Sequence, residues 1–402
     1  MSLPSVHSNQ APSGVIVPFN WVARVLRVPV FRLALGDDLV FRIIMAISAI
    51  FSGIVSLICQ RQFNFRSFDP IRAQKSLDRF IELGAKARFV TPQDGEGKIQ
   101  MMTFQAQDLE TRIQALGGSW KRRQVQGKEV FAIEPPQDQG EQWLSFKEKL
   151  SHFHWKEEEG VIITCDHAEL VPDNADKRCF LYAHSTSNCF ASAWKRAGFY
   201  IGAKQDLAYF DNGNTWKNKG RSPSEEAFYL EIEAVYSTIK DKYPVENLWV
   251  GGSCGGAPVA AHLKRLLHEK GINFFAEQSF ADLDDFVKPI SAFFAPRVKG
   301  SVNDLAWPAK TPRPLVSQFG TAQLWRDLPL YTGPKKGQFV LVEVDNDEDI
   351  NPLAYQRYHD LARSVNTHVT HIVYTSKAAY HHADDFYNYP DSRREFLEAV
   401  FK

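Results

Sequence analysis

Short apolar runs alternate with helical patterns from about residue 159 to the C-terminus, and this alternation constrains the fold more than any other feature of the chain. Apolar runs of this kind, bounded by polar and glycine-containing segments, are typical of buried strands. Strands that alternate with helices pair in parallel, and the helices cover both faces of the sheet. The sequence therefore predicts an α/β fold with a mostly parallel sheet flanked by helices. The expected strands are Val161–Thr164, Cys179–Ala183, Asp206–Phe210, Leu248–Val250, Phe274–Ala276, Phe339–Val344 and His371–Tyr374, and the clearest helices are Ser224–Lys240, Ala257–Lys270 and Leu353–Ser364.

Composition limits the partners of the chain. It has 402 residues, in which 47 basic and 47 acidic side chains balance. This length accommodates one large domain with additions, or two domains. Balanced charge gives no long-range attraction to nucleic acid, so we expect no nucleic-acid partner. The cysteines are widely spaced and form no C-x-x-C pattern, so we expect neither a disulfide framework nor a metal site. They are Cys59, Cys165, Cys179, Cys189 and Cys254.

A hydrophobic stretch near the N-terminus carries no charge over residues 43–59. At about 1.5 Å per residue it is slightly shorter than a bilayer core of about 30 Å, and extension to Leu39 closes the difference. We expect a membrane-associating helix over residues 37–61, with membrane contact through residues 39–60 and either orientation. Residues 1–36 then form an amphipathic or irregular segment. A buried helix of a globular domain is the alternative.

Three further parts of the chain follow the hydrophobic stretch. Residues 62–158 are expected to form either an N-terminal part of the main domain or a cap subdomain. Residues 159–402 form the α/β core. Within that core, residues 288–336 interrupt the strand–helix alternation, are rich in proline and aromatic residues, and are expected to form a lid.

The segment Gly251-Gly252-Ser253-Cys254-Gly255 contains the pattern G-x-S-x-G between an expected strand and an expected helix. In this pattern a serine nucleophile stands on a strained turn, and Gly251 and Gly255 leave room for it. We interpret Ser253 as the nucleophile. Cys254 is interpreted as the residue whose backbone N–H faces the oxyanion, and not as the nucleophile itself. The alternatives are a glycine-rich turn without chemistry and a phosphate-binding loop, although G-x-x-x-x-G-K-[ST] is missing here.

At these residues the chain resembles the α/β-hydrolase superfamily, in particular its esterase, lipase and acyl-peptidase branch, and more loosely the chlamydial CHLPS-type proteins. The resemblance covers roughly residues 175–402. It includes the segment His184-Ser185-Thr186 after an expected strand, which is similar to the loop that supplies an oxyanion donor. The resemblance implies that the backbone N–H of Thr186 is this donor. The family usually has glycine where this chain has Ser185. Two further segments fit the family order, Tyr209–Asn214 and Gln278–Leu283.

The resemblance also implies an acid and a base that follow the nucleophile in the order Ser, Asp, His. The loop after Phe339–Val344 offers Asp347 as the acid in the best register, with Asp345 and Asp349 as rivals. The segment His381-His382-Ala383-Asp384 precedes the last expected helix. His382 is the preferred base and His381 its rival, because imidazole exchanges protons near neutral pH.

Together these residues predict a serine hydrolase that cleaves an ester through a Ser-His-Asp triad and an acyl-enzyme, without a cofactor. The apolar stretches favour a small-molecule or lipid-like ester with an apolar acyl group. Two alternatives remain. One is a non-catalytic binding or scaffold protein on a hydrolase fold, since a fold does not determine a function. The other is a secreted bacterial factor that acts at host membranes.

Overall fold

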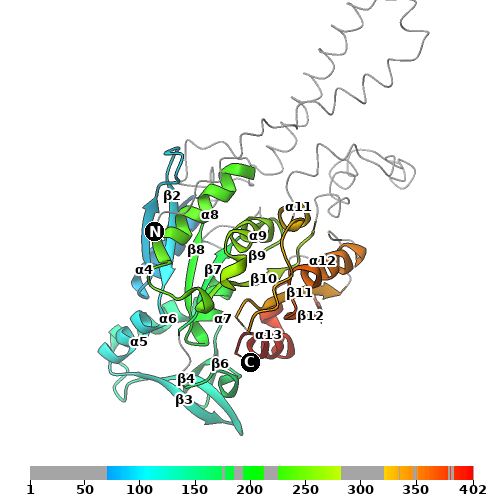
Figure 1. The fold of residues 1–402 in the computed structure, drawn as a ribbon. Coiled ribbons are helices and arrows are strands. Elements are labelled where there is room, and N and C mark those ends of the chain that lie inside the picture. The colour runs from blue at the N-terminus through cyan, green and yellow to red at the C-terminus, as the bar shows by residue number, and fades with distance from the viewer. Residues whose placement is uncertain are drawn as a thin grey trace, which may run out of the picture.

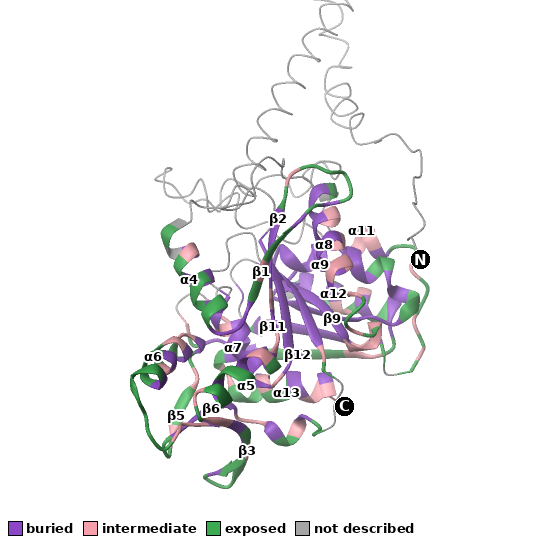
Figure 2. Ribbon diagram, turned by 90° about the vertical axis from the view of Figure 1, so that its left-hand side faces the viewer, coloured by how far each residue is buried: buried purple, intermediate pink, exposed green. Residues whose placement is uncertain are grey.

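The computed structural model describes residues 70–173, 177–184, 193–211, 225–281, 321–334, 336–345, 347, 350, 352–378, 381 and 384–401. Its centre is an eight-stranded sheet (Figure 1). Most of these strands are buried, as the purple ribbons in Figure 2 show. From one edge to the other, the strands are β1 (Lys86–Val90), β2 (Ile99–Phe104), β8 (Asp206–Phe210), β7 (Cys179–Ala183), β9 (Leu248–Ser253), β10 (Asn273–Glu277), β11 (Phe339–Asp345) and β12 (Val369–Thr375).

The six strands from β8 to β12 all pair in parallel, with β9 near the middle. At the other edge, β2 is antiparallel to both β1 and β8. Six of the seven expected strands lie in this sheet, and the predicted mostly parallel sheet flanked by helices is confirmed. Because parallel strands run the same way, the residues that follow β9, β10, β11 and β12 all lie at one edge of the sheet.

Helices cover both faces of the sheet and bury two apolar clusters. One cluster joins the sheet to α7 (Trp194–Gly202) and α13 (Pro390–Phe401), and the other joins it to α8 (Glu225–Ile239), α9 (Gly256–Leu266), α11 (Thr321–Trp325) and α12 (Pro352–Val365). Strand alternation distributes neighbouring residues between the clusters, since Trp249 lies in the first and Val250 in the second. Three more helices contribute to the first cluster, namely α4 (Pro70–Glu82), α5 (Ala106–Ala115) and α6 (Glu141–Leu150).

A second, antiparallel sheet has the strand order β3 (Ser119–Val125), β4 (Lys128–Glu134), β6 (Val161–Cys165) and β5 (Lys156–Glu158). The expected strand Val161–Thr164 is therefore a strand, but the prediction that it belongs to the parallel sheet is wrong. The apolar residues of β6 fit either kind of sheet. Its partner is decided by contacts distant in sequence, such as Ile133 beside Ile162.

The prediction of a membrane-spanning helix and of a membrane-associated location is contradicted. Among the helices of the described ranges, none combines the length and the apolar character that crossing a bilayer requires. The segment 37–61 itself, like residues 1–36, lies outside the described residues. Its charge-free run of seventeen residues, 43–59, was near the lower length limit for a span, which is why the sequence pattern misled.

The expected lid at 288–336 lies outside the described residues up to residue 320. Its described end contains α11, which packs against α9 and α12. Trp325 of α11 is 1% exposed, lies against Phe274 and Phe339 of the sheet, and donates a hydrogen bond to Ala261 O at 3.1 Å. This end of the segment is therefore part of the apolar core.

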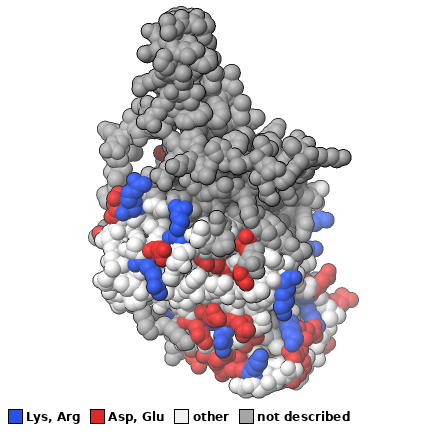
Figure 3. Space-filling model, turned by 90° about the vertical axis from the view of Figure 1, so that its right-hand side faces the viewer, with Lys and Arg blue, Asp and Glu red and all other residues white. Residues whose placement is uncertain are grey.

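Charged side chains of both signs lie near one another on the face shown in Figure 3. In the antiparallel sheet, Glu134 pairs with Lys121 at 2.8 Å and with Arg123 at 2.6 Å. Exposed pairs of this kind contribute at most about 1 kcal/mol each. The two apolar clusters, rather than the surface ion pairs, therefore hold the fold together.

One lysine lies inside the apolar core. Lys264 of α9 has no exposed surface, and its Nζ donates a hydrogen bond to Ile272 O at 2.5 Å. The ammonium lies 4.8 Å from the centre of the Phe339 ring, and no carboxylate of a described residue pairs with it. Burial lowers the pKa of Lys264 to about 7.

We expect Lys264 to make the protein more stable as the pH rises above 7. The unfolded state keeps the lysine pKa near its ordinary value of about 10.4, so between the two pKa values it binds more protons than the folded state. The free energy of unfolding should rise by up to about 1.4 kcal/mol per pH unit in this window, and Lys264→Met should lose that rise. Urea unfolding from pH 7 to 9 measures it. The control is Lys270→Met, at an exposed lysine close by, and equal slopes in the wild type and Lys264→Met would contradict the prediction.

Candidate active site

The turn between β9 and α9 lies at the carboxyl edge of the sheet and has almost no free space. A Cβ atom on Gly252 would lie 2.2 Å from Ala183 O, and one on Gly256 would lie 2.1 Å from the same oxygen. Only glycine fits at these two positions. Between them, Cys254 has a φ of 48°, in the left-handed region. For a residue other than glycine this conformation costs roughly 1–2 kcal/mol, and such strain concentrates at functional sites.

The backbone of Cys254 is held by the neighbouring strand. Its N–H donates to Glu277 O at 2.9 Å, and its carbonyl oxygen accepts from Ser279 Oγ at 3.0 Å. The Cys254 N–H, the expected oxyanion donor, therefore already has an acceptor within the protein. In contrast, no described residue accepts a hydrogen bond from the Gly255 N–H. Thr186, the other expected donor, and Ser185 of the same expected oxyanion loop lie outside the described residues.

Ser253 is the last residue of β9, not the apex of the turn. It is 2% exposed and pairs in register with Glu277 of β10. Alternation along β9 places its side chain on the same face as Trp249. Its hydroxyl makes no hydrogen bond of normal geometry with a described residue, although it lies near enough to the Tyr182 phenol to affect that group's pKa.

Below Ser253 lies a buried polar cluster centred on Glu277. This carboxylate accepts hydrogen bonds from Tyr182 at 2.8 Å and from Tyr387, and lies 3.8 Å from the guanidinium of Arg196. Arg196 also pairs with Asp385 at 2.9 Å. Burial raises the pKa of Glu277, although Arg196 and the two phenols favour its ionised form. The cluster connects β7, β10 and α7 to the segment before α13.

The preferred acid, Asp347, follows β11 and is 7% exposed. Its carboxylate accepts a hydrogen bond from the Ile350 N–H at 2.8 Å and another from the phenol of Tyr355 on α12. Burial, followed by the charge of Asp347, raises the pKa of Tyr355, so the phenol remains a donor. The rival Asp345 is the exposed last residue of β11, and Asp349 lies outside the described residues.

Gln278, which follows β10 with a φ of 46°, anchors the segment that carries the expected base. Its Nε2 lies 2.7 Å from Asp384 O and 3.3 Å from His381 O. Burial raises the pKa of Asp384, but hydrogen bonds from Ser376, Tyr389 and Asn388 outweigh this and lower it overall. His381 is half-buried, whereas His382 lies outside the described residues. The structure thus brings the backbone around His381 to the end of β10, beside the turn.

Sequence reasoning included Gln278 only as part of a segment that fits the family order, without a role, and it missed Tyr355. Neither residue type belongs to a catalytic motif. Gln278 acts through hydrogen bonds of its Nε2, and Tyr355 acts through one hydrogen bond to Asp347. His184, at the end of β7, is completely buried and lies 3.7 Å from Asp211 at the end of β8. Within the described ranges, no three His, Cys, Asp or Glu side chains are grouped so that they could hold a metal ion.

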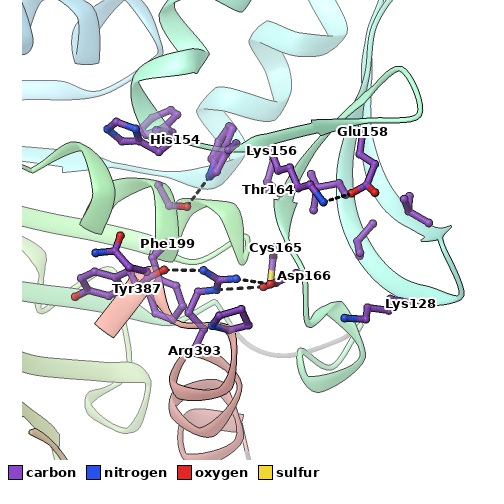
Figure 4. Close-up of a pocket in the computed structure, with 18 of the residues that line it drawn as sticks. Lys128, His154, Lys156, Glu158, Thr164, Cys165, Asp166, Phe199, Tyr387 and Arg393 are labelled. Atoms are coloured by element: carbon purple, nitrogen blue, oxygen red, sulfur yellow. Dashed lines mark hydrogen bonds and ion pairs between the residues drawn. The ribbon is translucent and has the colours of Figure 1, made fainter. Parts of the chain in front are cut away.

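A cavity of about 570 Å³ lies away from this turn, between the antiparallel sheet, α7 and the segment before α13 (Figure 4). Arg393 crosses one side of it, paired with Asp166 and donating to Tyr387 O at 2.6 Å. None of Ser253, Cys254 and Asp347 lines this cavity. It is therefore separate from the candidate active site.

Comparisons with known proteins found similar chains among the solved structures. No protein-family model matches the chain, and no curated protein matches it. Similar solved structures include the esterase Pf2001 of Pyrococcus furiosus, with 12% identity, a TM-score of 0.47, and coverage of 80% of this chain and 91% of that one. Another is an α/β hydrolase of Vibrio vulnificus, with 13% identity, a TM-score of 0.39, and coverage of 83% and 91%.

The fold itself is assigned from the topology. A parallel sheet with an antiparallel edge, helices on both faces, and a strained strand-to-helix turn after a central strand define the α/β-hydrolase fold, as predicted. The similarities above concern the fold alone, because the identities are low. The narrower resemblance to the chlamydial CHLPS-type proteins is not shown by any of them.

We expect Tyr355→Phe to lower the stability of the protein through Asp347. The change removes a hydrogen bond to a buried carboxylate, which is worth about 1.5–3 kcal/mol in the free energy of unfolding. Tyr358→Phe on the same helix is the matched control. It removes only an acceptor for Thr321 at 3.4 Å and should cost about 0.5–1.5 kcal/mol. Urea unfolding of both variants compares them, and an equal loss would show that the Asp347 contact has no special weight.

Gln278→Asn should loosen the segment around His381 without unfolding the protein. Asparagine tolerates the positive φ but is too short to reach Asp384 O. If this segment carries the base, kcat should fall by about 10- to 100-fold, since a displacement of about 1 Å has effects of this size. Gln205→Asn is the control. It removes two similar bonds, to Arg178 N at 3.1 Å and Ala203 O at 3.0 Å, at the opposite edge of the sheet. An equal loss of activity in both variants would count against the anchoring role.

Proposed function

We propose that this protein hydrolyses carboxylic esters through a covalent acyl-enzyme formed at the turn between β9 and α9. One observation carries the proposal: a strained, glycine-flanked strand-to-helix turn stands at the carboxyl edge of the sheet. A buried carboxylate, Asp347, follows β11, the second strand from β9, and a histidine-bearing segment is held at the end of β10, the strand between them. These are the three parts that acyl transfer needs.

In the proposed reaction a side chain of the turn attacks the ester carbonyl, and a histidine of the 381–382 pair takes its proton. Asp347 orients the imidazole and stabilises its charged form. The histidine then protonates the leaving alcohol, and water releases the acyl group. The sequence motif G-x-S-x-G offers Ser253 for this attack, and Cys254 is the other nucleophilic side chain of the turn. The helix N-terminus and backbone N–H groups support the negative charge that develops on the carbonyl oxygen.

The substrate in this proposal is a small-molecule ester with an apolar acyl group. Support comes from the sequence of residues 288–336, which is rich in aromatic residues and proline and contains the core helix α11. The competing interpretation is a binding or scaffold protein that keeps the fold without the chemistry. Only a measurement of turnover separates the two.

Hydrolysis of p-nitrophenyl esters from acetyl to decanoyl, by the full chain at pH 7.5, tests the proposal. We expect turnover above the spontaneous rate, and a fall of about a thousandfold or more in Asp347→Asn, because the imidazole loses its orienting acceptor. The control is Lys128→Ala, which changes the cavity of Figure 4 and should leave turnover as it is. Folded protein without turnover on any ester of the series would favour the scaffold interpretation.

A further inference from the structure

We propose that Cys254, and not Ser253, is the nucleophile of this site. The inference rests on the proposed function and names the atom that forms the covalent bond. The segment Gly251 to Gly256 contains two overlapping patterns of the form G-x-nucleophile-x-G. Both Ser253 and Cys254 have a glycine two residues before and two residues after them. The pattern centred on Ser253 uses Gly251 and Gly255, and the pattern centred on Cys254 uses Gly252 and Gly256.

The close contacts of the turn select the pattern centred on Cys254. A Cβ on Gly252 would lie 2.8 Å from the carbonyl carbon of Gly256, and both glycines press against Ala183 O. The small residues two before and two after the nucleophile are required where strand and helix meet this closely. Gly251 lies one residue earlier, within β9, and its space is limited by Phe275 of the next strand. Glycine is therefore needed at position 251 for the packing of neighbouring strands and not for the turn.

The backbone conformation also favours Cys254 as the nucleophile. Cys254 has a φ of 48°, whereas Ser253 is the last residue of β9 and pairs with Glu277 in the parallel ladder. A nucleophile on this kind of turn is the residue that carries the strained conformation, which points its side chain out of the sheet edge. Ser253 has the ordinary conformation of a strand residue and lacks this property.

The two side chains also belong to opposite faces of the sheet. Cys254 is part of the apolar cluster that contains Tyr355, whose phenol holds Asp347. Ser253 shares its face with Trp249, and its hydroxyl is buried near Tyr182, above the Glu277 cluster. The thiol therefore lies on the side of the sheet where the candidate acid is held, and the hydroxyl does not.

The hydrogen-bond donors agree with a nucleophile at position 254. The N–H of the nucleophile itself can be used within the sheet, and the Cys254 N–H is so used, with Glu277 O as its acceptor. The oxyanion donor is the N–H of the next residue. That residue is Gly255, from whose N–H no described residue accepts a hydrogen bond.

The chemical step balances with a thiol. The histidine takes the thiol proton, sulfur forms a bond to the carbonyl carbon, and the π electrons move to the oxygen. The tetrahedral intermediate collapses as the carbon–oxygen bond to the alcohol breaks, and the histidine gives the proton to the leaving alkoxide. Water then adds to the thioester, with its proton taken by the histidine, and the thiol is restored as the carboxylic acid leaves. No redox partner is involved.

Kinetics of single variants of the full chain test the inference with p-nitrophenyl acetate. Cys254→Ala should lower the p-nitrophenol burst and turnover by about a thousandfold or more, while Ser253→Ala keeps a burst. The matched control is Cys165→Ala, at another buried thiol, on β6 of the antiparallel sheet. Thermal unfolding establishes that each variant is folded. Loss of the burst in Ser253→Ala, together with its retention in Cys254→Ala, would overturn the inference.

Mapping of the trapped acyl group gives a second readout that does not depend on the variants. The wild type is mixed with p-nitrophenyl acetate, quenched in acid, and fragmented between residues 253 and 254 in the mass spectrometer. Acetyl on Cys254, released by neutral hydroxylamine as a thioester, supports the inference. Acetyl on Ser253 overturns it and leaves the proposed hydrolase function intact. Absence of both the acetyl group and turnover contradicts the proposed function itself, and the inference with it.

Discussion

The β9–α9 turn packs directly against the carbonyl oxygen of Ala183, and the rest of the site depends on this contact. Two glycines, Gly252 and Gly256, make that approach possible, since any Cβ there would collide with the oxygen. The contact brings the N-terminus of α9 against β7 in the middle of the sheet. The strain at Cys254 follows from it, because the chain must reverse within two residues between strand and helix.

The Glu277 cluster supports the turn from below. It joins β7 through Tyr182, α7 through Arg196 and the last segment of the chain through Tyr387. Burying a carboxylate without these partners would cost free energy. The cluster therefore stabilises only the arrangement in which all its elements are in place. The backbone carbonyl oxygen of Glu277 also accepts the hydrogen bond from the Cys254 N–H. Glu277 of β10 therefore takes part both in the buried polar cluster and in the geometry of the turn.

Much of the sheet could be predicted from the sequence, because its central strands are short, apolar and separated by clear helices. The partner of Val161–Cys165 could not, since its apolar residues suit a parallel or an antiparallel sheet equally. The general location of the site was also predictable from glycine, serine and histidine motifs. The register of the turn was not, because a sequence with glycine at 251, 252, 255 and 256 satisfies two patterns at once.

The register is decided by packing several residues away. A shift of β9 by one residue would move every side chain of the strand to the opposite face. Trp249 would leave Phe180 and Phe396, whose ring centres lie 6.0 and 6.5 Å from its own, and would enter the cluster that holds Val250. Burying an indole where a valine fits overpacks the cluster, which costs about 1–3 kcal/mol or more in the free energy of folding. This cost opposes the shifted register. The aromatic core below α13 therefore determines that position 254, and not position 253, stands at the apex of the turn.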